Sequence, residues 1–214
     1  MNKIVKRVGG LFTLIVVLVT LIGCNEVEKA EKSVNNMFEA FKNSDIETAS
    51  NYVDFYEFQN YLTAANNSEG TIPTMQDSFS DLFTNSFTNM LLSKLQYKII
   101  SSEKIDGKTV LVTTEITTLD MMPIISQFVQ ESVKNAFANA FSEEKISEEE
   151  QTKIAEEELA ELMNNPESET LTSTVDIIVE KTEKSWIIKT DKDFANAVFG
   201  GLIDVANVMN KDSE

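Results

Sequence analysis

Apolar side chains beyond residue 25 recur every three or four positions along several stretches of the chain, a spacing that places them on one face of an α-helix. The stretches with this spacing are residues 27–41, 46–62, 79–91, 125–141, 154–163 and 194–209. Pairs with capping-box spacing precede three of the predicted helices, namely Asn25 with Glu28, Ser44 with Glu47, and Ser147 with Glu150. We therefore predict helices over these stretches, with a polar break at residues 66–70.

The apolar spacing alternates in two places, which predicts two β-hairpins. The first covers residues 95–118 and turns at Asp106-Gly107, a dipeptide that favours a two-residue turn. The predicted register pairs Tyr97 with Ile116, Ile99 with Thr114, and Lys98 with Glu115. In the second hairpin, residues 171–190, a turn at Thr182-Glu183 pairs Val179 with Trp186, Ile177 with Ile188, and Asp176 with Lys189. Each hairpin is apolar on one face and charge-paired on the other, which predicts one antiparallel sheet covered on one side.

A helical block of about residues 120–165 separates the two hairpins, so the class is α+β. Its first apolar stripe consists of Ile125, Phe128, Val129, Val133, Ala136, Phe137, Ala140 and Phe141. Phenylalanines at helical spacing are typical of a core, and the alternative is that they line a ligand cavity. Trp186 is interpreted as a core residue. Gly200-Gly201 lacks the context of a phosphate-binding loop, so it predicts a helix kink or a close-packing site.

The N-terminal residues follow a different pattern. An uncharged apolar run from Val8 ends in Leu21-Ile22-Gly23-Cys24 and is preceded by Lys3, Lys6 and Arg7. This order resembles the signal peptide and lipobox of bacterial lipoproteins, which implies cleavage after residue 23 and an S-diacylglyceryl group on Cys24. The run is shorter than the roughly 20 apolar residues of a transmembrane helix. Leu21 also departs from the small residue that an ordinary secretory signal has at this position.

Composition narrows the possible functions. The whole chain carries 18 basic and 35 acidic side chains and a net charge of −17. Removal of residues 1–23 leaves 191 of the 214 residues, with 15 basic and 35 acidic side chains and a net charge of −20. A body this acidic repels nucleic acid, and its charge favours solubility at a cell surface.

The candidate chemistry is limited by two residue types. The chain has no histidine, which excludes Ser-His-Asp and Cys-His sites, and Cys24 is its one cysteine, which excludes a disulfide framework. The densest carboxylates are Glu143, Glu144, Glu148, Glu149, Glu150, Glu156, Glu157, Glu158 and Glu161. They lack the turn that makes oxygen ligands converge on calcium, so we interpret them as a solvated helix face. No metal ligand, cofactor or catalytic residue is assigned.

Several stretches together resemble a family. They are Ser33–Val53 with NSDIETASNYV, Tyr97–Leu119 with EITT, AFANAFSEE at 136–144, KSWIIKTD at 184–191 and AVFGGL at 197–202. In this order they are similar to Gram-positive surface lipoproteins of unknown function with a cystatin-like, nuclear-transport-factor-two-like fold. The resemblance implies a curved antiparallel sheet of about four strands whose concave face is roofed by helices. It implies no active-site residues.

These observations predict a signal peptide at residues 1–23 and a single extracytoplasmic domain at residues 24–214. The first hypothesis is a non-catalytic binding domain held at the outer face of the cell membrane by the lipid on Cys24, with a protein or a small apolar ligand as partner and no nucleic acid. The alternative is a surface enzyme that uses Asp, Glu or Tyr for acid–base chemistry in the cone of the fold. A third possibility is assembly through an apolar face of the helix at Ile125–Phe141.

Overall fold

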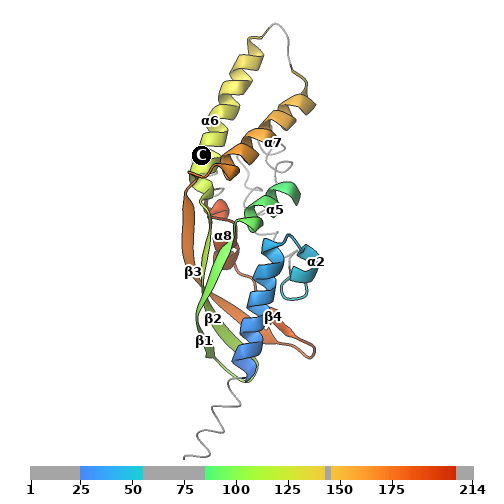
Figure 1. Cartoon of the computed structure of the whole chain (residues 1–214), viewed down its shortest axis with the longest axis vertical. Coiled ribbons are helices and arrows are strands. Elements are labelled where there is room, and N and C mark those ends of the chain that lie inside the picture. Colours follow the sequence, from blue (N-terminus) through green and yellow to red (C-terminus); the bar gives the residue numbers. More distant parts are fainter. Residues whose placement is uncertain (1–24, 55–84, 143–145, 206–214) are drawn as a thin grey trace, which may run out of the picture.

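Four strands form one antiparallel sheet in the computed structural model, which describes residues 25–54, 85–142 and 146–205. The strands are β1 Gln96–Lys104, β2 Thr109–Leu119, β3 Thr170–Lys181 and β4 Trp186–Ile188, and they lie in the order β1-β2-β3-β4. Figure 1 shows that the sheet curves along its length. The predicted class is confirmed: two hairpins make one sheet, and the central pair β2–β3 joins them.

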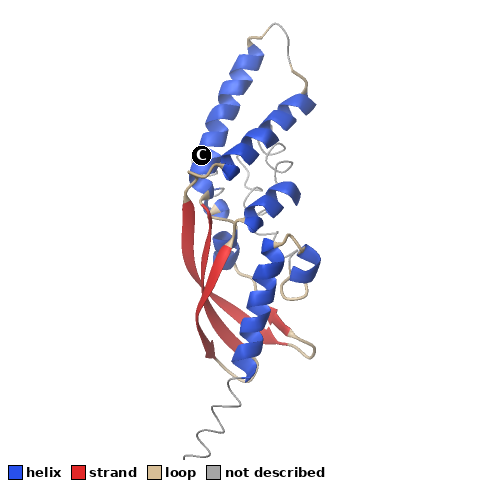
Figure 2. Cartoon of the chain, in the orientation of Figure 1, coloured by secondary structure: helices blue, strands red, loops and turns tan. Residues whose placement is uncertain are grey.

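The helices lie on one side of this sheet and beyond one of its ends (Figure 2). They are an N-terminal helix of residues 25–42, α2 Ile46–Ala49, α5 Asn85–Ser93, α6 Met121–Ala140, α7 Glu148–Asn164 and α8 Lys192–Val198, and residues 202–205 are also helical. The predicted insertion between the hairpins consists of α6 and α7, which we call the arm. Among the described residues, no helix combines the length and the apolar character that are needed to cross a membrane.

The core lies between the inner face of the sheet and the N-terminal helix with α8. Strand β2 alternates from Thr109 to Thr117, because Val110, Val112, Thr114 and Ile116 are buried while the residues between them are partly exposed. The outer face is mainly polar: Thr113 donates to Asp176 at 2.7 Å, and the hydroxyls of Thr117 and Thr172 lie 2.8 Å apart. The exception is Ile178, which is exposed on this face opposite Leu111. A period of two therefore predicted the buried face correctly.

The first hairpin has the predicted register in its far half and a different register near the turn. Tyr97 pairs with Ile116 as predicted, but Lys104 pairs with Val110. The Asp106 side chain accepts a hydrogen bond from the amide of Lys108 at 2.7 Å, which closes a loop longer than the predicted two-residue turn. A bulge between Ile99 and Ser101 then restores the predicted pairing.

The register predicted for the second hairpin is wrong by two residues. Val179 pairs with Ile188, and Lys181 pairs with Trp186. The reason is the turn: the hydroxyl of Thr182 accepts a hydrogen bond from the amide of Ser185 at 3.0 Å, which closes a four-residue loop. Because the shift is an even number, every side chain keeps its predicted face, and Trp186 is buried as predicted.

The helix predicted after Ser44 is shorter than expected, and its cap is a different residue. Asp45 is the N-cap of α2, and its carboxylate accepts a hydrogen bond from the amide of Thr48 at 3.0 Å. Ser44 instead has a positive φ of 57° in the connection. After the helix ends, Tyr52 accepts a backbone hydrogen bond from Ile188 at 2.8 Å, so this segment runs beside β4 instead of continuing as a helix.

Gly200-Gly201 forms the predicted kink and close-packing site. Both residues have positive φ, at 63° and 80°, which is a conformation that favours glycine. A Cβ atom on Gly200 would overlap the carbonyl oxygen of Leu119. The stretches predicted as helices at residues 55–62 and 79–84 lie outside the described residues, as do residues 206–209.

Candidate functional site

The first turn of the N-terminal helix is tied to the ends of two strands. The Glu26 carboxylate forms ion pairs with Lys104 at the end of β1 and with Lys181 at the end of β3, the latter at 3.3 Å. Hydrogen bonds from Lys104, and then from Lys181, lower the pKa of Glu26. These ion pairs therefore fix the first turn of the N-terminal helix to the ends of β1 and β3.

The predicted lipidation site precedes this fixed point. Cys24 and the lipobox residues Leu21, Ile22 and Gly23 lie outside the described residues. The described helix begins at residue 25, one residue before Glu26.

The space between the sheet and the N-terminal helix is filled by aromatic side chains. Phe38 stacks on Tyr97 with ring centroids 4.5 Å apart and meets Phe194 edge-on at 6.1 Å. Burial and the neighbouring Glu39, whose carboxylate accepts the Tyr97 hydroxyl at 3.1 Å, raise the pKa of Tyr97 to about 12. The phenylalanines of the N-terminal helix are therefore core residues, as predicted for phenylalanines at helical spacing.

Among the described residues, the core between the sheet and the N-terminal helix contains no buried carboxylate. Within residues 25–54, 85–142 and 146–205, the buried polar side chains are Ser33, Thr88, Thr114 and Thr118. A general acid or base needs a carboxyl or phenol whose pKa is shifted toward neutrality, and the pKa of Tyr97 is shifted away from it.

The arm is fixed where it leaves the sheet. Asp120 is the N-cap of α6, and its side chain accepts a hydrogen bond from the amide of Met122 at 3.0 Å. The amide of Asp120 donates to Glu169 at 2.9 Å, and the amide of Met121 donates to Gly200 at 2.9 Å. Leu159 and Met163 of α7 are buried in the same core. The proximal end of the arm is thus part of the body.

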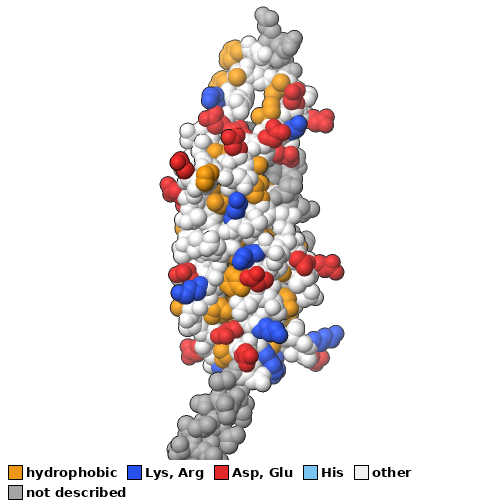
Figure 3. All heavy atoms as spheres, in the orientation of Figure 1, with side chains coloured by type: hydrophobic (Ala, Val, Ile, Leu, Met, Phe, Trp, Pro, Cys, Tyr) orange, Lys and Arg blue, Asp and Glu red, His pale blue; other side chains and the backbone are white. Residues whose placement is uncertain are grey.

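Along the rest of α6, the apolar stripe emerges from the body. The exposed fraction is 2% at Ile125 and 4% at Phe128, and it rises to 40% at Val133, 63% at Phe137 and 85% at Phe141. Figure 3 shows hydrophobic side chains on the surface of the distal half of the arm. The interpretation of this stripe as core is therefore correct at its proximal end and wrong for Phe137 and Phe141.

Helix α6 turns a polar side to α7. Asn135 donates to Glu158 at 3.4 Å, and Asn139 accepts from the amide of Ile146 at 3.1 Å. At 100° per residue, each asparagine is about 200° around the helix from Val133 or Phe137, two positions before it. The exposed stripe consequently faces away from α7. These two asparagines are the sequence signal from which the exposure of the distal part of the stripe could have been predicted.

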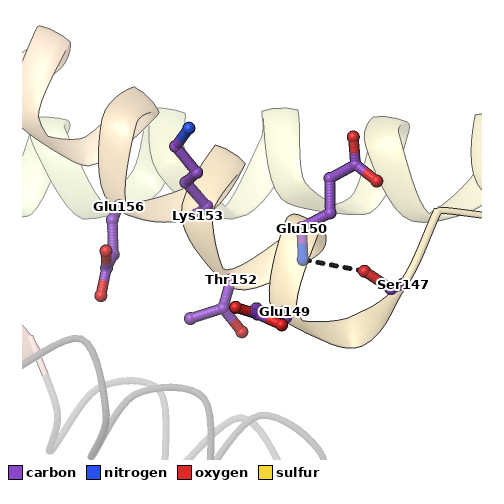
Figure 4. Close-up of a pocket in the computed structure, with 6 residues that line it drawn as sticks. All are labelled: Ser147, Glu149, Glu150, Thr152, Lys153 and Glu156. Atoms are coloured by element: carbon purple, nitrogen blue, oxygen red, sulfur yellow. Dashed lines mark hydrogen bonds between the residues drawn. The ribbon is translucent and has the colours of Figure 1, made fainter.

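The carboxylate cluster does not form a binding site in the described residues. Ser147 caps α7 as predicted and accepts a hydrogen bond from the amide of Glu150 at 3.2 Å. A shallow depression beside this cap is lined by Ser147, Glu149, Glu150, Thr152, Lys153 and Glu156, and Figure 4 shows that Glu150 points away from Glu149 and Glu156. No group of the described His, Cys, Asp and Glu side chains could hold a metal ion.

One glutamate of the cluster departs from the solvated face. Glu158 lies partly buried between α7 and α6, and its Oε1 atom is buried without a hydrogen-bond partner. Burial raises the pKa of Glu158, and repulsion from Glu131 adds to the effect. The Lys134 ammonium, which pairs with Glu131 at 2.9 Å, acts in the opposite direction.

Comparison with known proteins adds little to this picture. No family model matches the chain, and no curated protein matches it. A solved structure from Bacillus subtilis, named as a "putative lipoprotein (ycdA)", is similar at 18% identity and a TM-score of 0.43. The likeness covers 70% of this chain and 43% of the other, so the chain spans less than half of its length. The cystatin-like part of the resemblance stays a prediction.

Proposed function

We propose that the chain is a lipoprotein that displays a non-catalytic interaction domain at the outer face of the cytoplasmic membrane. The observation that carries the proposal is the order of the first 24 residues, in which a basic start and an uncharged apolar run end in Leu21-Ile22-Gly23-Cys24. Two or more acyl chains on Cys24 would give stable attachment, because each buried methylene contributes about 0.8 kcal/mol.

The place of the lipid relative to the fold supports this reading. Cys24 is two residues before Glu26, which is tied to β1 and β3. Two residues reach at most about 7 Å, so the base of the body would lie against the bilayer. Figure 1 shows the arm at the opposite end of the molecule from residue 25. An anchored copy would therefore present the distal arm away from the membrane.

The surface supports a protein partner over a small apolar ligand. The inner phenylalanines Phe38, Phe41 and Phe194 are fully buried in the core. Phe137 and Phe141, in contrast, place aromatic area on the surface of the arm. Exposed aromatic side chains at the surface are typical of protein interfaces.

Lipid attachment is tested with full-length Cys24→Ser in the native membrane, with Thr20→Ser as a matched control that changes a residue outside the lipobox. The wild type and the control are expected to incorporate a clickable palmitate analogue and to partition into the detergent phase. Cys24→Ser is expected to lose the label and to keep residues 1–23. A Cys24→Ser chain that is still cut before residue 24 and stays with washed membranes contradicts the proposal.

A further inference from the structure

The open side of α6 has the spacing of a coiled-coil seam. Residues at alternating intervals of four and three share this side, and we call them the α6 seam: Met122, Ser126, Val129, Val133, Ala136 and Ala140. A mean spacing of 3.5 residues is the repeat at which two helices pack along a common seam. Phe137 and Phe141 flank the seam on one side. All of these residues except the partly buried Val129 are exposed.

We propose that the α6 seam pairs with the α6 seam of a second copy of this chain, in parallel and around a two-fold axis. The inference rests on the proposed function, because it uses the membrane to orient both copies. Helix α6 points away from the start of the N-terminal helix in Figure 1, so the seams of two anchored copies would stand at the same height and run in the same direction. A two-fold axis along the membrane normal then brings each seam residue to its own counterpart.

Charge favours a second copy over other occupants. The seam itself contains no charged residue, and the flanking Lys134 is paired with Glu131 at 2.9 Å. Residues 121–164 hold ten acidic and three basic side chains, a net charge of −7. Most of these acids belong to α7, which lies on the other side of α6. Self-pairing therefore places no like charges across the seam, where they would oppose association.

Other occupants fit the same surface less well. A basic partner helix would need carboxylates beside the seam. Among the described flanking positions the charged residue is Lys134, which would repel such a partner. The bilayer that holds Cys24 would lie at the opposite end of the molecule. Confinement of anchored copies to one plane raises their effective concentration, which lowers the affinity that a single helix face must supply for pairing.

The test uses cysteine cross-linking in membranes, where lipidation of Cys24 leaves an introduced cysteine as the free thiol. Ala136→Cys and Ala140→Cys place it in the seam, and Ala138→Cys places it on the same helix, exposed but off the seam. Mild oxidation is expected to give a disulfide-linked dimer from both seam variants and none from Ala138→Cys. Adding Val133→Glu to Ala140→Cys is expected to lower the dimer yield by about tenfold or more, because it opposes two carboxylates at the axis.

Two results would overturn the pairing. Seam thiols that are alkylated as readily as the thiol of Ala138→Cys and form no dimer show an open seam. Seam thiols that resist alkylation without forming a dimer show that another protein, or another segment of the same chain, covers the seam. Alkylation and dimer formation are both measured on protein that is retained in the membrane. Loss of membrane retention in all variants contradicts the proposed function instead, so the two failures are distinguishable.

Discussion

The N-terminal helix and α6 are two amphipathic helices that look alike in the sequence and differ in their burial. The N-terminal helix buries its apolar stripe from Ala30 onward, with Val34, Phe38 and Phe41 all at 0% exposure. The stripe of α6 begins in the same core and ends with Phe141 at 85% exposure. Helical periodicity therefore establishes that a face is apolar, and the tertiary structure decides what covers it. An apolar face left open is the candidate for interaction.

Replacing one buried and one exposed phenylalanine by alanine is expected to give the largest difference between the two helices. Phe38→Ala is expected to lower the free energy of unfolding by about 3–5 kcal/mol, because it leaves a cavity between Tyr97 and Phe194. Phe141→Ala is expected to change it by no more than about 0.5 kcal/mol, because the ring is already in water. Chemical unfolding of the purified protein measures both, and equal losses would contradict the contrast.

The attachment of the arm to the body is the next largest effect. Gly200→Ala is expected to cost at least about 2 kcal/mol, because a side chain is strained at positive φ and its Cβ would meet the Leu119 carbonyl. Gly201→Ala has the same kind of strain, but its Cβ would meet the Leu171 side chain at 3.3 Å, so its loss is expected to be smaller. Thermal unfolding of the pair gives the order, and a larger loss for Gly201→Ala would contradict the close packing.

Mutations of two helix caps, one in the body and one in the arm, are expected to affect stability in different regions. Asp191 caps α8 and accepts a hydrogen bond from the amide of Phe194 at 2.8 Å, while Ser147 caps α7. Asp191→Ala is expected to cost about 1 kcal/mol of global stability. Ser147→Ala is expected to increase amide exchange in the first turns of α7 and to leave the sheet unchanged. Hydrogen exchange resolved by peptide distinguishes the two variants, and faster exchange in β2 of Ser147→Ala would contradict an effect confined to the start of α7.

The base and the arm are expected to respond to acid in opposite directions. The pKa of Glu158 is raised above 4.5, so its stabilising protonation is fully present below 4.5 and is lost as pH rises through the raised pKa. The pKa of Glu26 is lowered, so its contribution is present above 4.5 and is lost as pH falls through the lowered pKa. NMR titration of the two carboxyl carbons measures both. Glu158→Gln should remove the gain on acidification, and a lowered Glu158 pKa would contradict its burial.

The faces of the sheet were predictable from the sequence, and so was the pairing in the far half of the first hairpin, but the pairing near its turn and in the second hairpin was not. An alternation of apolar and polar residues fixes which side chains are buried, so the buried face of β2 and the burial of Trp186 followed from the pattern. The register depends on the turns, where a single side chain decides: Asp106 closes the loop of the first hairpin, and Thr182 closes that of the second. Neither hydrogen bond changes the apolar pattern.

The candidate site was predictable only in part. The sequence placed an apolar stripe between Ile125 and Phe141 and allowed for assembly through it. It did not separate the buried end from the open end, because residues with the same spacing are core wherever another element covers them. The asparagines at 135 and 139 carried that information, since they turn the polar side of α6 toward α7.

The central claim is that a lipid on Cys24 holds this body at the membrane, and the mass of the mature N-terminus tests it most directly. Top-down mass spectrometry of protein extracted from native membranes should find a chain that begins at residue 24 and carries at least a diacylglyceryl group on its first residue. A chain that begins elsewhere, or that has an unmodified thiol at residue 24, would contradict the account.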